Sequence, residues 1–165
     1  MKKLNIMKKK SSFYYPALLL ILGIFFTGSV NVNAQTGISI RNLDRHELHQ
    51  DLKQTMNHVR KMRRIRIKSR NDLNKQRYYP HVKSIRKRAE ASRKHVEALK
   101  KELARDERSE KRFNNIIFGY DNILHEEAAM EKELDLPKSD NNRLEKHENA
   151  IETKLTELKK LLKDI

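Results

Sequence analysis

Apolar residues recur at helical spacing along most of the chain. From residue 82 to residue 134, steps of alternately three and four residues meet mainly apolar side chains. This spacing places one apolar stripe along a helix, which is stable in water only when another helix covers it. We therefore predict a long central helix at about 81–134, whose stripe is interrupted by the polar residues Asp106 and Glu110.

Two shorter helices are predicted on either side of the central one. The first, at about 44–77, has Asp44 as a candidate N-cap and ends before Pro80, because proline lacks an N–H and biases the preceding residue away from helix. The alternative is a single kinked helix that continues through Pro80. The last, at about 141–165, follows the Pro137 loop and keeps a heptad pattern of apolar residues.

These elements predict an all-α fold of elongated antiparallel helical hairpins. In this coiled-coil-like three-helix arrangement, both shorter helices fold back along one long central helix, and their free ends meet at its polar interruption. The alternative is a compact three-helix bundle, which requires the central helix to bend near Gly119 or near residue 108. Glycine is a poor helix former and makes such a bend cheaper.

The first 34 residues have the pattern of a signal peptide. Lysines at the start are followed by a continuous apolar run at 17–26 and by small residues before Ala34, after which we predict cleavage. A retained N-terminal membrane anchor is the alternative. We therefore expect an extracytoplasmic protein, periplasmic or secreted, with no stable membrane span after processing. It would consist of a flexible leader at 35–43 and a helical domain at 44–165.

Charge and cysteine content restrict the partners of this domain. Beyond residue 34 the chain has 32 basic and 22 acidic residues, a net charge of +10, and residues 41–100 hold 19 of the former against six of the latter. Such asymmetry indicates an anionic partner or contact between the two halves of neighbouring molecules. The absence of cysteine excludes disulfides and thiolate metal sites.

The most basic stretch is 60–94, which holds fifteen lysines and arginines against two acids. Arginine dominates it, and guanidinium groups fork onto phosphate or carboxylate. Because export makes nucleic acid a less expected partner, we consider phosphorylated glycans, lipid head groups, extracellular DNA and acidic protein surfaces. The alternative is an ordinary solvated helix surface. The candidate anion-binding residues are Arg60, Arg63, Arg64, Arg66, Arg70, Arg77, Arg86 and Arg88.

Other chemistry has weaker support in the sequence. His46 and His49 lie at i and i+3 on one helix face and are the best metal-ligand candidates, although a site needs at least a third ligand. With two glycines after residue 34, no glycine-rich phosphate loop is available. We expect no enzyme activity, no cofactor and no small-molecule substrate. A wide apolar arc supplies candidate contact residues for a protein partner: Ile116, Phe118, Tyr120 and Ile123.

These features predict an exported, non-enzymatic helical interaction or scaffold protein with a basic face, which we expect to self-associate. In size and class the chain resembles the small periplasmic chaperones of the Spy and CpxP type, but their Leu-Thr-x-x-Gln signature does not occur in it. A chaperone-like or envelope-stress binder of unfolded or acidic clients is therefore one alternative function. Binding of anionic polymers through residues 60–94 is the other.

Overall fold

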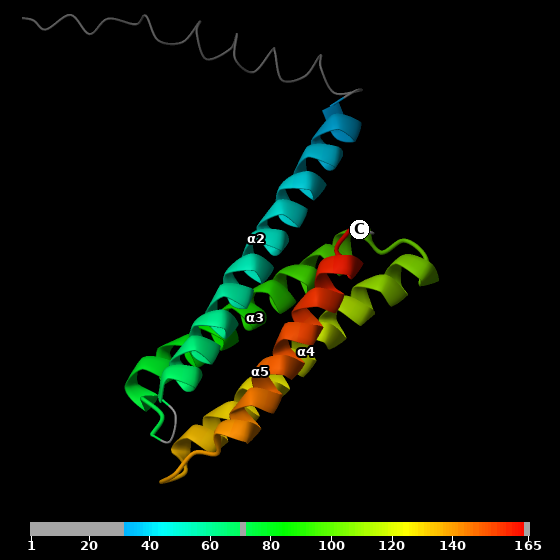
Figure 1. The fold of residues 1–165 in the computed structure, drawn as a ribbon. Helices are drawn as coiled ribbons and strands as arrows, with labels where there is room; N and C mark the ends of the chain where they lie inside the picture. The colour runs from blue at the N-terminus through cyan, green and yellow to red at the C-terminus, as the bar shows by residue number, and fades with distance from the viewer. Residues whose placement is uncertain (1–31, 70–71, 164–165) are drawn as a thin grey trace, which may run out of the picture. The chain divides into compact units, whose positions relative to one another are not determined.

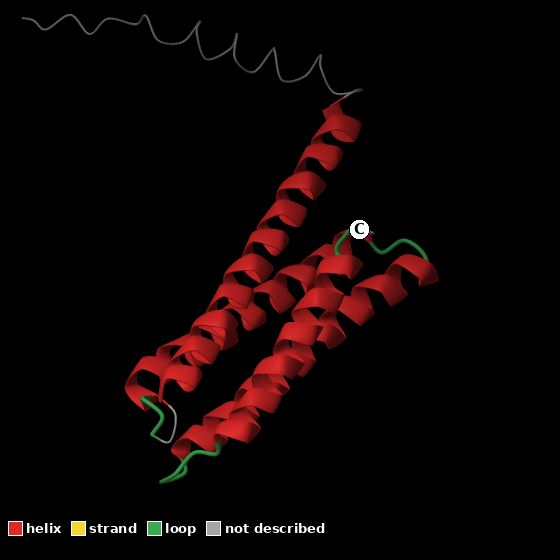
Figure 2. Ribbon diagram, viewed as in Figure 1, coloured by secondary structure: helices red, strands yellow, loops and turns green. Residues whose placement is uncertain are grey.

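Four α-helices make up the described residues, 32–69 and 72–163 of a computed structural model, and no strand occurs among them (Figure 2). The predicted all-α class is confirmed. The chain divides into two compact units, residues 1–42 and 43–165, and all contacts given below lie within the second. The predicted signal peptide lies outside the described residues, apart from residues 32–34. In chain order the helices are α2 (Val32–Ser69), α3 (Lys75–Leu103), α4 (Glu107–Asp135) and α5 (Asn141–Leu161).

The second unit forms an antiparallel four-helix bundle in which each helix runs opposite to the one before it (Figure 1). Helix α3 packs along α4 and α4 along α5, and side chains of α2 contact both α3 and α5. This closed order of neighbours is the usual result of short loops between successive helices. The predicted antiparallel hairpins are present, but the bundle consists of four helices where three were predicted.

Apolar stripes from all four helices meet in one core. Each stripe recurs at the three- and four-residue spacing of an amphipathic helix, so that the same face points inward throughout. Burial of these side chains is the main favourable contribution to folding of a bundle without disulfides. The fully buried apolar residues include Leu48, Val59, Met62, Val82, Ile85, Val96, Ile116, Ile123, Met130, Leu144, Ile151 and Leu158.

The predicted long helix at 81–134 is wrong, because residues 104–106 separate α3 from α4. Asp106 is the N-cap of α4: its side chain accepts a hydrogen bond from the backbone N–H of Ser109 at 2.6 Å, and the Ser109 side chain accepts one from the backbone of Asp106. This capping box satisfies free donors at a helix start. The polar residues that interrupt the stripe therefore mark a helix end, and the chain reverses there.

The turn between the first two helices also lies earlier than predicted. Helix α2 ends at Ser69 and α3 begins at Lys75, where the side chain of Asn74 accepts a hydrogen bond from the backbone N–H of Arg77 at 3.1 Å. Pro80 lies inside α3, on an exposed face where its ring meets solvent. Tyr78, two residues before Pro80, is fully buried in the core, and tertiary packing of this kind can override the low helix propensity of proline.

Two other predictions concern the start of α2 and the start of α5. The predicted leader at 35–43 is helical, since α2 already begins at Val32. The last helix begins at Asn141 as predicted, and its N-cap is Asp140. Helix α4 is continuous through Gly119, so the bend considered there does not occur.

Candidate functional site: a cationic groove between α2 and α3

Polar pairs join α2 to α3 at intervals of seven residues on each helix. Asp44 bonds to His95 (3.1 Å), Asp51 to Arg88 (2.7 Å), and the Nδ1 atoms of His58 and His81 lie 3.1 Å apart. Two antiparallel helices with heptad spacing bring the same positions together in every second turn. These three pairs define the α2–α3 seam, and the functional candidates lie at its two ends.

At the loop end of the seam lies an open groove of about 680 Å³. We call it the cationic groove. Among its described lining residues, four are lysines or arginines, one is a histidine and none is acidic. Its lining residues are Lys61, Arg64, Ile65, Lys68, Ser69, Asn74, Arg77, Pro80 and His81.

The four cations of the groove are exposed and form no ion pair within the described residues. Three come from α2 at a spacing of three and four residues, which puts them on one helix face, and Arg77 faces them from the first turn of α3. Like charges held this close repel each other and destabilise the fold slightly. An anion bound among them would remove that repulsion.

The histidine pair lies beside these cations. Burial lowers the pKa of both His58 and His81, and the charge of Lys61 lowers each further. For His58, the neighbouring His81 and Arg88 also act in this direction. The two facing Nδ1 atoms can share a single proton, and the lowered pKa values favour the neutral form of each ring. Protonation of this pair on acidification would therefore add positive charge beside the groove.

The structure separates the eight predicted anion-binding arginines into three groups. Arg64 and Arg77 line the cationic groove, and Arg60 lines a second groove between α2 and α5. Arg70 lies outside the described residues. The remaining four are engaged within the bundle, with carboxylates of α2, α4 and α5: Arg63, Arg66, Arg86 and Arg88.

Arg66 is the most buried of the four paired arginines. Its side chain is 9% exposed and donates two hydrogen bonds to Glu148 Oε2, at 3.0 and 3.2 Å. Burial tends to lower the pKa of Arg66, but the hydrogen bonds and charge of Glu148 outweigh it and raise that pKa. Such an arginine holds helices together, and an external anion would have to break the pair.

No family model, curated protein or solved structure matches this chain. No helix in the described part of the chain is long and apolar enough to cross a membrane.

The second groove differs from the first in its charge. It has a volume of about 620 Å³ and includes Arg60, Lys53 and Lys159, but also Glu152. Glu152 accepts a hydrogen bond from Arg63 at 2.5 Å, which places a compensated acid in the lining. The described lining of the second groove therefore holds three lysines and arginines and one acid, against four lysines and arginines and no acid in the cationic groove.

The predicted apolar contact surface does not exist as a surface. Ile116, Tyr120 and Ile123 are buried in the bundle core, where α4 meets its neighbours, and burial raises the pKa of Tyr120 well above its usual range. Phe118 alone among the four is exposed, with 65% of its surface accessible. A wide apolar arc on α4 is explained by its position between α3 and α5, because a helix with two neighbours needs two apolar faces.

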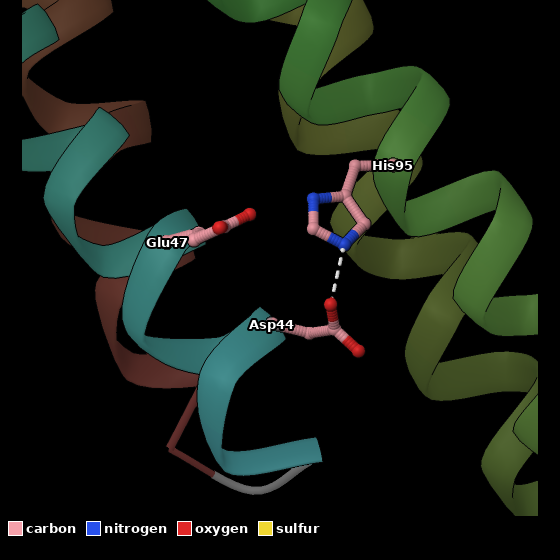
Figure 3. A group of neighbouring side chains, drawn as sticks. All are labelled: Asp44, Glu47 and His95. Carbon is pink, nitrogen blue, oxygen red and sulfur yellow. Dashed lines mark hydrogen bonds and ion pairs between the residues drawn. The ribbon is translucent and has the colours of Figure 1, made fainter. Parts of the chain in front are cut away.

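The histidines predicted as metal ligands do not gather a third ligand within the described residues. His46 is exposed, and His49 lines the second groove, where burial and then Arg45 lower its pKa. A different histidine, His95, meets two carboxylates of α2 (Figure 3). Sequence reasoning missed this group because His95 is far from its partners in sequence, and only the heptad register of the seam relates them.

Proposed function

We propose that this protein is an exported, non-enzymatic binding protein that holds a phosphate-bearing anionic polymer in its cationic groove. One observation carries the proposal: a single groove is lined by Lys61, Arg64, Lys68 and Arg77. Within the described part of the chain, no acid lines this groove and no carboxylate pairs with these four cations. The arginines that do find carboxylates are engaged elsewhere. Acidic residues are present on α4 and α5, but none of those in the described part of the chain forms an ion pair with these four cations.

The chemistry of the groove suits the oxygens of phosphate groups. Guanidinium groups present a planar fork of N–H donors that matches two phosphate oxygens, and ammonium groups of lysine add point charges. Arg64 and Arg77 approach from different helices, so that a chain of phosphates passing between α2 and α3 would meet one fork from each side. A polymer gains from several such weak contacts at once, because each phosphate neutralised releases counterions.

The proposed extracytoplasmic location restricts which anionic polymers the groove could meet. The signal-peptide pattern of the first 34 residues favours an extracytoplasmic location, where phosphorylated glycans and extracellular DNA are available polymers. Both present phosphodiester groups along a chain, which is the shared chemistry that we propose the groove recognises. Self-association and client holding remain weaker hypotheses, since three of the four predicted contact residues are in the core.

A labelled oligothymidylate serves as a defined phosphodiester polymer for testing the proposal. We expect it to bind the purified protein with an affinity that falls log-linearly with salt concentration. Replacing both groove arginines, Arg64→Gln with Arg77→Gln, should weaken binding at least tenfold and reduce the salt slope by about 0.7 for each phosphate that is no longer neutralised. Polyglutamate, a polyanion without phosphate, should bind more weakly than the oligonucleotide.

The matched control removes two exposed arginines at the other end of α3 and α4. Arg105→Gln with Arg108→Gln changes the net charge by the same amount, and both residues lie outside the groove. We expect this variant to bind almost as well as the unchanged protein. Equal losses in the two double variants would mean that net charge alone attracts the polymer, and would reject the groove as the site.

A further inference from the structure

Three metal-ligating side chains converge at the end of the seam away from the α2–α3 loop. Asp44 and Glu47 extend from α2, and His95 faces them from α3 (Figure 3). One donor atom from each lies within 4.8 Å of the other two, and Asp44 Oδ1 is 3.1 Å from His95 Nε2. The residues come from two helices, so that an ion among them would join α2 to α3.

The heptad register of the seam accounts for the pair of Asp44 and His95, but not for Glu47 beside them. Asp44 lies inside α2, well after its start at Val32, so it caps no helix, and aspartate is a poor residue for a helix interior. Glu47 has an exposed side chain with no hydrogen bond or ion pair to any described residue. Residues 41–100 contain only six acids among 19 cations, yet two of the six face one imidazole.

The geometry suits a small divalent transition-metal ion. Zinc binds imidazole nitrogen and carboxylate oxygen at about 2.0–2.2 Å, so donors around a tetrahedral ion lie about 3.3 Å apart. Asp44 and His95 are already near that separation. Glu47 has to approach by an ångström or so, which its exposed and unpartnered side chain allows by rotation.

We propose that Asp44, Glu47 and His95 bind a divalent first-row transition-metal ion of the Zn²⁺ class. Three protein ligands leave a fourth position for water, and the mixed nitrogen and oxygen donors favour Zn²⁺ or Co²⁺ over Mg²⁺ or Ca²⁺, which prefer oxygen alone. The ion takes the place of the hydrogen bond between Asp44 and His95 and fixes the far end of the seam. This site is separate from the cationic groove, and its failure would leave the proposed function untouched.

The test is titration of the purified protein with Zn²⁺ by calorimetry and with Co²⁺ by visible absorption. We expect one ion per chain, an intense Co²⁺ spectrum of low coordination number, and a rise in the unfolding temperature when Zn²⁺ is present. Glu47→Gln and His95→Asn should each weaken Zn²⁺ binding at least tenfold. Because Glu47 is exposed and unpartnered, its replacement leaves packing intact and tests the site without unfolding it.

Two control variants separate this site from other histidines. His125→Asn changes an exposed histidine of α4 and should bind Zn²⁺ like the unchanged protein. His46→Asn tests the pair predicted from sequence and should also have little effect. The proposal is overturned if no stoichiometric binding is seen, if His95→Asn binds normally, or if His46→Asn abolishes binding while Glu47→Gln does not.

Discussion

Arg66 of α2 and Glu148 of α5 form a buried ion pair, with Nη2 and Oε2 3.0 Å apart although 82 residues separate them in sequence. The other oxygen of Glu148 accepts a hydrogen bond from the hydroxyl of Tyr78 at 2.9 Å. Burial and the adjacent carboxylate raise the pKa of Tyr78, so that it stays a donor. One carboxylate thus ties together three helices in the interior of the bundle.

We expect Glu148→Ala to destabilise the fold by about 3–5 kcal/mol, because it leaves a buried guanidinium and a buried hydroxyl without their main partner. The free energy of unfolding, measured by urea denaturation, checks this. Glu145→Ala is the matched control: Glu145 also contacts Arg66, at 3.0 Å, but its side chain is 49% exposed, so we expect a loss of about 0.5 kcal/mol. Similar losses in the two variants would contradict a central role for Glu148.

Sequence periodicity predicted the helices well and their ends less well. The heptad pattern located α5 and the inward faces of α3 and α4, since burial requires that pattern whatever the helix length. Asp106 and Ser109 at the break at 104–106 have the pattern of a helix cap. The same polar residues also fit a continuous helix whose apolar stripe is interrupted, so the sequence allowed both interpretations. Only the packing of α4 against α3 decides between the two interpretations, and that is a tertiary property.

The candidate site was predictable only in part. The basic run indicated a cationic surface, but it gave no way to separate Arg64 from Arg66, which lie two residues apart and so on different faces of α2. The acids that engage the paired arginines lie mainly on α4 and α5. Which cations remain free therefore depends on the register between helices, which the sequence of one helix does not contain.

Gly119 of α4 lies against the side chain of Leu158 of α5. A Cβ atom added at this position would lie 2.6 Å from Cδ2 of Leu158, a fully buried side chain. We expect Gly119→Ala to destabilise the protein by about 1 kcal/mol, since overpacking costs about 1–3 kcal/mol and alanine regains up to about 1 kcal/mol of helix propensity. Removing the obstacle should reverse the sign: in a Leu158→Ala background, Gly119→Ala becomes stabilising. Thermal unfolding of the unchanged protein, the two single variants and the double variant tests this. Additive effects of the two substitutions would show that contact with Leu158 is not the cause.

Glu127 makes the stability of the bundle depend on pH. Its side chain is 1% exposed, and burial raises its pKa to about 7 although Arg86 donates a hydrogen bond to it at 2.8 Å. Between the ordinary pKa of 4.5 and about 7 the folded state binds more protons than the unfolded state, so stability falls as pH rises through this window. We therefore expect Glu127→Gln to gain about 1–3 kcal/mol relative to the unchanged protein between pH 5 and pH 8. Urea denaturation at both pH values measures the difference, and parallel pH profiles would contradict the prediction.

We expect the histidine pair to make the proposed anion binding in the cationic groove depend on pH. Since the pKa values of His58 and His81 are lowered in the folded state, the unfolded chain takes up these protons first, and the pair reduces stability as pH falls below about 6.5. Protonation adds positive charge beside Lys61 and Arg64.

We therefore expect the affinity for oligothymidylate, whose phosphodiesters stay ionised throughout, to rise about threefold to tenfold from pH 7.5 to pH 5. An added charge near the ligand contributes on the order of 1 kcal/mol in a largely aqueous groove. Replacing His81 with glutamine should flatten the profile, whereas His125→Gln, at an exposed position on α4, should leave it unchanged. A profile that stays steep without His81 would place the responsible proton elsewhere, and the histidine pair would then have only a packing role at the seam.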